Sequence, residues 1–438
     1  MDPNSSSVTK SEPLFTSARR QMTTPAPNRM ATFSERLARK AVLGRMRTMG
    51  HGRLVIAEDG AAHALGGGAG PEAYVHIHDP ATWAAIAGGG TVGAGAAYMA
   101  GQWSCADLTS LIRIFLSNRA ALDGMERGMA RMGAMVFKTL HALNRNTREG
   151  SRRNIAAHYD LGNDFYRLWL DETMMYSSAL FARDDQNLHQ AQIAKMDRIA
   201  ELLEIKATDH VLEIGSGWGG MAIHTARTTG CRVTTTTISR AQHDLAVERV
   251  RAAGLTNRVT VQLNDYRDLT GTYDKLVSIE MIEAVGHQFY DTYFATCSRL
   301  LKPDGLAVIQ AITIAEQQYA TAIREVDFIQ RYIFPGSNIP SFGAISSAIG
   351  RAGDLNVISM DDLAPHYVRT LQCWRDNFHA HIEAVRAQGF DERFIRMWEF
   401  YLAYCEGGFA ERAIGVTHLR LAKPAWRHGY QQRLDGVG

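Results

Sequence analysis

The segment with the clearest chemical signal is Val211-Leu-Glu-Ile-Gly-Ser-Gly-Trp-Gly-Gly220, an apolar run followed directly by glycines. Gly215 and Gly217 permit a tight turn and let the backbone approach a ligand that a Cβ atom would exclude. The spacing Gly-x-Gly-x-Gly differs from the Gly-x-Gly-x-x-Gly of dinucleotide-binding folds, although Gly220 prevents a strict exclusion of a pyrophosphate ligand. A glycine turn alone also serves as an ordinary structural turn in many proteins.

Polar residues after the next two apolar runs could contact a nucleoside. The second run ends in Thr237-Ile-Ser-Arg-Ala-Gln242, which offers hydroxyl and amide groups to a ribose, although Ser239 could also be an ordinary helix N-cap. The third run is followed by Asn264-Asp-Tyr-Arg-Asp268, where a carboxylate and an aromatic ring could contact an adenine. Tyr266 could equally be a core aromatic residue.

Short apolar runs alternate with helix-like stretches between residues 210 and 310. Such an alternation predicts βαβ crossovers and a parallel sheet, whose ligands bind beyond the carboxyl ends of the strands. The fold class predicted is therefore α/β. The expected strands are Val211–Ile214, Arg232–Ile238, Val259–Leu263, Lys275–Ile279 and Leu306–Gln310, with helices at Met221–Thr228, Gln242–Ala253 and Tyr290–Leu301. From Ile314 to Ser359 we expect a helical insertion before a final strand and further helices.

Length and composition indicate an ordinary globular protein with two or three domains. The 438 residues, 46% hydrophobic and with a net charge of +2, exclude a disulfide-stapled scaffold, a disordered chain and a strongly basic nucleic-acid binder. We expect a disordered tail (1–32), an N-terminal domain (33–143), a linker (144–153) and a catalytic domain (154–430). Within the N-terminal domain, the pattern predicts strands at Leu54–Glu58 and Tyr74–His78 and helix from Leu108 to Leu143.

Several features bear on location and partners. Five widely spaced cysteines predict a protein in a reducing compartment. The N-terminus lacks the charged and then apolar segments of a secretory signal, so we expect a cytoplasmic protein. The uncharged stretch Pro80–Ala106 holds six glycines, and we expect it to be too helix-poor to span a membrane. Residues 1–50 hold nine Lys/Arg against three Asp/Glu, which suggests contact with an anionic surface; a solvated leader without a partner is the alternative. The pairs His76-x-His78 and His379-x-His381 have a spacing that could suit a metal, but no third ligand lies nearby in the sequence, so no metal is expected.

Several ordered motifs together resemble the cyclopropane fatty-acyl-phospholipid synthase family, which includes the mycolic-acid cyclopropane synthases. The similarity covers roughly residues 150–425. Besides the three segments above, the motifs are His158-Tyr-Asp-x-Gly-Asn-Asp-Phe165, Met175-Tyr-Ser177, Tyr332-Ile-Phe-Pro-Gly336, Pro365-His-Tyr-x-x-Thr-Leu371, and Phe400-Tyr-Leu402 with Phe409.

The resemblance implies a Rossmann-like methyltransferase that uses S-adenosylmethionine (SAM) and a small N-terminal α/β lipid-binding domain. It implies methyl transfer to the double bond of an unsaturated acyl chain in a membrane phospholipid, at the anionic inner leaflet. By position, the residues expected to line the cofactor site are Tyr176, Ser177, Gly215, Gly217, Thr237, Ile238, Gln242, Asp265 and Tyr266. A homo-oligomer and a downstream flavin-dependent oxidoreductase are further partners that the sequence leaves open.

The chemistry expected of such an enzyme passes through a carbocation on the acyl chain, which a base must deprotonate before water adds. Proton loss from the new methyl group closes a cyclopropane ring, whereas proton loss from a chain carbon leaves a methylated unsaturated acid. Ring-forming relatives hold a bicarbonate ion as that base, bound by Cys, Glu, His and Tyr residues. By position, Glu283 and Tyr367 remain in this chain, whereas the Cys is Ser178 and the His is Gln310.

A third departure is Glu280, which stands where the family has a small glycine. Our hypothesis is that Glu280 supplies the carboxylate that bicarbonate supplies elsewhere, which favours a methylated unsaturated or methylene fatty acid. Two alternatives stay open at this site: Glu280 could cap the following helix, and Ser178 with Gln310 could hold bicarbonate and leave ring formation intact. A methyltransferase of a small soluble metabolite and a non-catalytic lipid-binding protein are the other functional alternatives.

Overall fold

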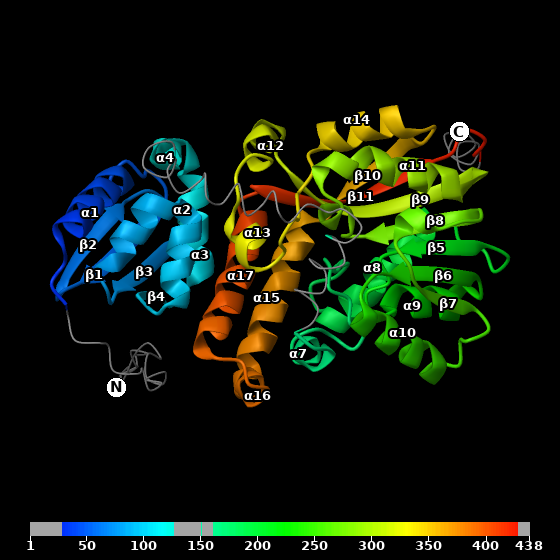
Figure 1. The fold of residues 1–438 in the computed structure, drawn as a ribbon, viewed down its shortest axis with the longest axis horizontal. Coiled ribbons are helices and arrows are strands. Elements are labelled where there is room, and N and C mark those ends of the chain that lie inside the picture. The colour runs from blue at the N-terminus through cyan, green and yellow to red at the C-terminus, as the bar shows by residue number, and fades with distance from the viewer. Residues whose placement is uncertain (1–28, 127–149, 151–160, 428–438) are drawn as a thin grey trace, which may run out of the picture.

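The computed structural model describes residues 29–126, 150 and 161–427, which contain two β-sheets (Figure 1). The smaller sheet is N-terminal and has the strand order β2-β1-β3-β4. Two of its strands, β1 (Arg53–Glu58) and β3 (Glu72–Ile77), match the predicted runs, whereas β2 (Ala61–Gly66) and β4 (Trp103–Cys105) were not predicted. Residues 61–66 are Ala-Ala-His-Ala-Leu-Gly, a composition with weak strand propensity, and they pair with β1 across a tight hairpin at Asp59 and Gly60.

The glycine-rich stretch after β3 is helical, which corrects the expectation that it is helix-poor. It forms α2 (Ala81–Met99), with a kink at Gly90, whose φ of 51° lies outside the helical region. Packing overrides the weak helix propensity of the glycines, because α2 contacts both α1 (Phe33–Met46) and α17 (Glu392–Ala410). Among the described residues, no helix is both long and apolar enough to cross a bilayer.

The helix predicted from Leu108 to Leu143 is described only in part. Residues 108–126 form α3 (Leu108–Ser117) and α4 (Arg119–Glu126). The remainder of the predicted helix, the predicted linker apart from Gly150, and residues 1–28 of the predicted tail lie outside the described residues. The proposed domain boundaries therefore stay predictions. Residues 29–32 of the predicted tail are described, and Thr32 is the N-cap of α1.

The larger sheet has seven strands in the order β10-β11-β9-β8-β5-β6-β7. Five are parallel and occur where the alternation predicts them: β5 (His210–Ile214), β6 (Arg232–Thr237), β7 (Val259–Leu263), β8 (Tyr273–Ile279) and β9 (Leu301–Ile314). The crossover helices α9 (Gly220–Thr229), α10 (Arg240–Ala252) and α11 (Tyr290–Leu300) also match. The order reverses beside β5, so the carboxyl ends of β5, β6 and β8 border one crevice.

The C-terminal part adds two antiparallel strands to this sheet. After the helices α12 (Glu316–Ala322), α13 (Phe328–Tyr332) and α14 (Phe342–Ala352), the chain forms β10 (Asn356–Asp362) and later β11 (Ile414–Ala422). A single final strand was predicted, and the second was missed because it follows the last helices. Between these strands lie α15 (Ala364–Ala380), α16 (Ile382–Ala387) and α17.

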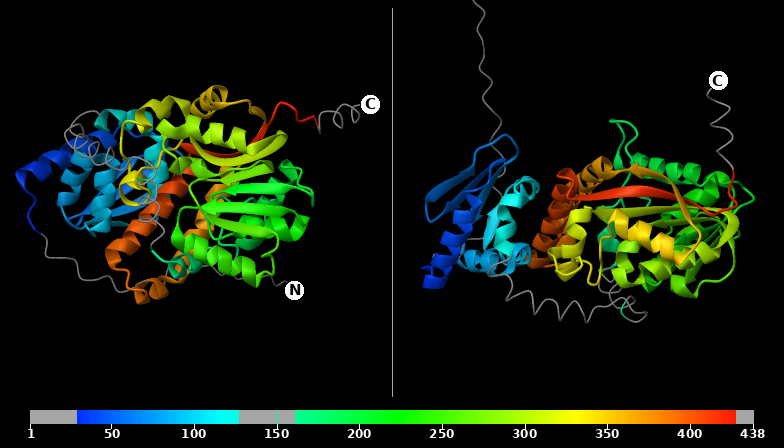
Figure 2. Two further views of the ribbon diagram at one scale, coloured as in Figure 1. Left: turned by 45° about the vertical axis from the view of Figure 1, so that its right-hand side comes forward. Right: turned by 90° about the horizontal axis from the view of Figure 1, so that it is seen from above.

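Helix α17 joins the two sheet units. With α15 it lies between the N-terminal sheet and the larger sheet in Figures 1 and 2, and it packs against α15 and α3. A buried polar cluster crosses this contact: Arg375 of α15 pairs with Glu406 of α17, and Thr109 of α3 donates a hydrogen bond to the same carboxylate. The N-terminal domain is therefore held by apolar packing and by charge-assisted hydrogen bonds.

Candidate active site

One cavity lies at the carboxyl ends of β5, β6, β7 and β8, where a doubly wound sheet binds its ligands. All nine residues that the resemblance assigns to the cofactor line this cavity. They come from four separate segments of the chain, which the sheet brings together. The wall includes Tyr176, Ser177, Gly215, Gly217, Thr237, Ile238, Gln242, Asp265 and Tyr266, and also Glu213, Arg267 and Glu280.

The glycine turn after β5 has the conformation that its composition predicts. Gly215 and Gly217 have φ values of 97° and 47°, in the left-handed region that residues with a Cβ atom rarely adopt. Gly220 begins α9, and a Cβ atom there would lie 2.6 Å from the carbonyl oxygen of Thr173. The positive φ values at Gly215 and Gly217 and the close approach of Thr173 at Gly220 thus favour glycine in the turn that leads to the N-terminus of α9 at the cavity.

The polar groups predicted to contact a nucleoside are held by hydrogen bonds to neighbouring side chains. Thr237 Oγ1 donates to Gln242 Oε1 at 2.9 Å, which leaves the Gln242 amide nitrogen as a donor for a ribose. Asp265 is bound by Arg267, with Nε to Oδ1 at 2.8 Å and Nη2 to Oδ2 at 2.6 Å. Arg267, which the sequence analysis did not single out, therefore holds the Asp265 carboxylate in position at the cavity wall.

Glu280 is the centre of a hydrogen-bonded cluster that contains three other predicted catalytic residues. Its Oε1 accepts from the Ser178 backbone N–H at 2.9 Å and from Gln310 Nε2 at 2.7 Å, and its Oε2 accepts from the Tyr367 hydroxyl at 2.7 Å. Burial raises the pKa of the Glu280 carboxyl, and the bonds from Tyr367 and Ser178 oppose that shift. Three donors on one carboxylate stabilise its charged form in a buried site.

The conformation and hydrogen bonds of Glu280 exclude the alternative in which it caps the following helix. Glu280 follows the last residue of β8, and its φ of 47° lies in the left-handed region, which favours glycine. Its carboxylate binds groups on other elements rather than the N–H groups of the 3₁₀ helix Ile282–Ala284 that follows. Non-glycine residues in this region cost on the order of 1–3 kcal/mol and persist where the surroundings enforce them.

His418 orients the amide of Gln310, and sequence analysis missed it. Gln310 lies within β9 and is paired in register with His418 of β11. His418 Nε2 lies 2.9 Å from Gln310 Oε1, and burial lowers the His418 pKa to about 3, so the ring is neutral and donates from Nε2. That bond directs Gln310 Nε2 towards Glu280. The two residues are 108 positions apart, and only the strand pairing brings them together.

Glu283 differs from Glu280 in its surroundings. Its Oε1 accepts a hydrogen bond from the Ile312 backbone N–H, and its Oε2 is buried without a hydrogen-bond partner among the described residues. Burial and the neighbouring Glu280 charge raise the Glu283 pKa to about 8. Glu283 is therefore largely protonated at neutral pH, and its neutral form avoids charge repulsion with the adjacent Glu280 carboxylate.

A buried carboxylate in the cavity wall supports S-adenosylmethionine as the ligand. Glu213 lines the cavity, and its Oε2 is a buried acceptor without a partner among the described residues. An ammonium group such as that of an amino acid would satisfy it. With the positive-φ glycines and the ordered Asp265, this arrangement suits a nucleoside joined to an amino acid. The fold and cavity define the class of Rossmann-like, SAM-dependent methyltransferases.

Comparison with known proteins places the chain within that class. Residues 146–419 match the family described as mycolic acid cyclopropane synthetase. The chain is 38% identical over 376 residues to the tuberculostearic acid methyltransferase UfaA1 of Mycobacterium tuberculosis, an alignment covering 84% of this chain and 87% of that protein. It is 35% identical over 350 residues to the cyclopropane-fatty-acyl-phospholipid synthase of Escherichia coli K12, covering 78% and 86%.

A solved structure gives the same result. The mycolic acid cyclopropane synthase CmaA1, crystallised with S-adenosylhomocysteine, superimposes with a TM-score of 0.58 at 30% identity and covers 62% of this chain and 98% of its own. The chain belongs to the cyclopropane and mycolic acid synthase family and is a SAM-dependent methyltransferase. The resemblance, the fold class and the cofactor predicted from the sequence are confirmed.

Proposed function

We propose that this enzyme methylates the double bond of an unsaturated acyl chain in a membrane phospholipid, and that Glu280 is the base that completes the reaction. The observation that supports the proposal is the Glu280 carboxylate on the cavity wall, held by Ser178, Gln310 and Tyr367. The named lipid methyltransferases and synthases among its relatives support the substrate class.

Bound SAM supplies an electrophilic methyl group to the alkene. The protein's own residues then act on the carbocation that is left on the acyl chain. The negative charge of Glu280 stabilises this carbocation, and one carboxylate oxygen accepts a proton from a neighbouring carbon as the C–H electron pair forms a new C=C bond. A carbocation is strongly acidic, so a carboxylate with three hydrogen bonds is basic enough. We propose that the product keeps a carbon–carbon double bond, as a methylated unsaturated or methylene fatty acid.

The surroundings of Ser178 and Gln310 weigh against bicarbonate as the base. The Gln310 amide N–H and the Ser178 backbone N–H both donate to Glu280, and the Ser178 hydroxyl donates to the Ala179 carbonyl oxygen at 3.0 Å. Donors that could bind a free anion are therefore satisfied by a carboxylate that belongs to the chain. The name of the relative UfaA1, a tuberculostearic acid methyltransferase, supports a methylated product over a ring.

Two substitutions of Glu280 test this role. We expect Glu280→Gln to reduce turnover on unsaturated phospholipid vesicles by about 10²–10⁴-fold, the range typical of a lost general base, with unchanged affinity for S-adenosylhomocysteine. Glu280→Gly restores the family's residue and leaves the donors of Ser178, Gln310 and Tyr367 free to bind an anion. Added bicarbonate should therefore restore part of the activity of Glu280→Gly, and it should not restore the activity of Glu280→Gln. Full turnover of Glu280→Gln, or dependence of the wild type on bicarbonate, contradicts the proposal.

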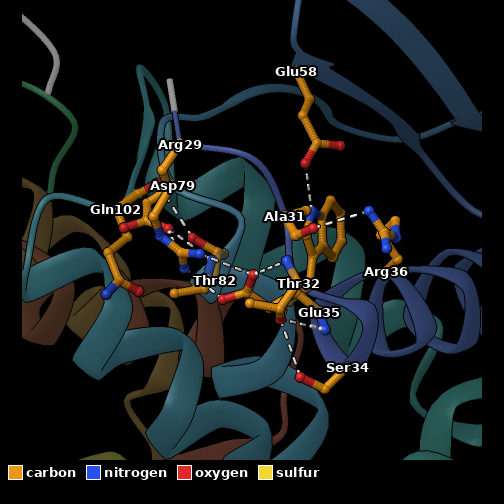
Figure 3. Close-up of polar contacts among 12 residues, drawn as sticks. Arg29, Ala31, Thr32, Ser34, Glu35, Arg36, Glu58, Asp79, Thr82 and Gln102 are labelled. Carbon is orange, nitrogen blue, oxygen red and sulfur yellow. Dashed lines mark hydrogen bonds and ion pairs between the residues drawn. The ribbon is translucent and has the colours of Figure 1, made fainter. Parts of the chain in front are cut away.

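We further propose that helix α1 contacts the anionic inner leaflet. Phe33 and Leu37 lie one turn apart and are 76% and 59% exposed, and the exposed Arg36 and Lys40 flank them. Figure 3 shows how the start of α1 is fixed: Thr32 and Glu35 form a capping box, and Arg29 bridges Glu35 and Asp79. This membrane contact would place the enzyme at the cytoplasmic face.

Two partners predicted from the sequence also stay proposals. A flavin-dependent oxidoreductase would consume an unsaturated product, because reduction of its new double bond gives a saturated branched chain. Self-association is the other. Pull-down with the full chain tests for the oxidoreductase, and analytical sedimentation of the full chain tests for self-association; neither experiment depends on methyl transfer.

A further inference from the structure

Lys195 is a buried cation that the proposed chemistry does not use. It lies on α8 (Leu188–Leu202) and is fully inaccessible to solvent. Among the described residues no carboxylate lies within 4.0 Å of its Nζ, whose hydrogen-bond acceptor is the Ser177 hydroxyl oxygen at 2.7 Å. Burial of an ammonium group is unfavourable and lowers the pKa of Lys195 to about 8, although the charges of Glu280, Asp171 and Glu213 oppose that shift.

Helix α8 holds Ser177 from the side away from the cavity. Gln192 Nε2 donates to the Ser177 carbonyl oxygen at 2.9 Å, and Lys195, one turn further along the same helix face, donates to the Ser177 hydroxyl oxygen. Ser177 itself is part of the cavity wall. Because its oxygen accepts from Lys195, the hydroxyl hydrogen is directed away from Lys195 and can donate to a ligand.

A hydroxyl donor polarised by a buried ammonium is a site for an anion. SAM carries one anionic group, its α-carboxylate, beside an α-ammonium group. The same cavity holds the matching acceptor, the buried and unpartnered Oε2 of Glu213. Together, Ser177 and Glu213 present one donor and one acceptor to the two charges of an amino acid.

We infer that Lys195 is a positioning residue that acts through Ser177 to bind the α-carboxylate of SAM. This inference rests on the assignment of the cavity to SAM. It predicts that removal of the Lys195 ammonium group weakens the binding of ligands that have the α-carboxylate. The binding of ligands that lack this carboxylate should not change.

Isothermal titration of the full chain tests the inference. The ligands are S-adenosylhomocysteine and its decarboxylated analogue, which keeps the adenosine, the thioether and the amine. We expect Lys195→Met and Ser177→Ala each to weaken S-adenosylhomocysteine about tenfold or more, to change analogue affinity less than twofold, and to be non-additive when combined. Lys275→Met, a partly buried lysine of β8 outside the cavity wall, is the matched control and should bind both ligands normally.

Each other result overturns the inference. An equal loss for both ligands would indicate a structural role for Lys195, and no loss for either would exclude carboxylate binding. If Lys195→Met does not fold, Lys195→Gln, which keeps a side-chain donor but removes the charge, takes its place. It must then weaken the binding of S-adenosylhomocysteine more than that of the analogue, and equal losses overturn the inference. Wild type that binds neither ligand would instead refute the cavity assignment.

Discussion

At the scale of the residue, Glu280 combines a strained backbone with a fully bonded side chain. Its left-handed φ is unfavourable for glutamate, and its carboxylate is buried among donors from three other segments. A backbone conformation that suits glycine thus directs a carboxylate into the cavity. The strain is compatible with a functional role, because residues in such conformations cluster at active sites.

Glu283 gives a pH prediction with a defined sign. Its pKa is about 8 in the folded protein, against an ordinary value near 4.5, so between these pH values the folded state binds more protons than the unfolded state. The free energy of unfolding contributed by Glu283 is complete below about pH 4.5 and is lost as the pH rises to 8. Glu283→Gln lacks this loss, so its stability relative to wild type should increase from pH 5 to pH 8.

Urea unfolding of both proteins at the two pH values measures the difference. Glu248→Gln, at an exposed glutamate of α10, is the control and should show the same pH dependence of stability as wild type. A stability difference between Glu283→Gln and wild type that stays constant or narrows with rising pH would contradict the protonated state of Glu283.

At the scale of the element, the contact between α17 and α3 depends on a small residue. A Cβ atom at Gly407 would lie 2.7 Å from Ile112 Cγ2. We therefore expect Gly407→Ala to destabilise the protein by about 1–3 kcal/mol, although alanine has the higher helix propensity. Gly350→Ala in α14, where nothing lies within 4 Å, should instead stabilise by up to about 1 kcal/mol. Thermal unfolding measures the change in stability of each variant. Equal changes in the two variants would contradict the claim that close packing between α17 and α3 requires glycine at position 407.

The sequence was informative where a signal is local. The alternation of apolar runs predicted β5 to β9, and the glycines and polar residues after the strands predicted the cavity wall, because parallel strands end at one edge. Strand β2 escaped prediction because its composition has a weak strand propensity, and β4 because it has only three residues and pairs with β3 across the length of α2. The roles of His418 and Lys195 depend on contacts 108 and 18 residues away, and a lysine in a helical pattern ordinarily indicates a solvated face.

At the scale of the whole molecule, the proposed membrane contact predicts a localised loss of binding. Phe33→Ser with Leu37→Ser should reduce cosedimentation with anionic vesicles several-fold, because both side chains are exposed on α1. Val357→Ser with Met360→Ser, at exposed apolar residues of β10, is the matched control and should bind normally. Binding of wild type should weaken as salt rises. An equal reduction in both double variants, or none in either, would contradict a docking role for α1.

The central claim, that Glu280 directs proton loss towards an unsaturated product, is tested most directly by analysis of the reaction product. The enzyme is incubated with SAM that carries a trideuterated methyl group and with unsaturated phospholipid vesicles, and the fatty acids are analysed by mass spectrometry before and after catalytic hydrogenation. We predict a branched product that takes up one equivalent of hydrogen, with three deuteriums when a chain carbon loses the proton. A cyclopropane product with two deuteriums, formed in proportion to added bicarbonate, would contradict the claim.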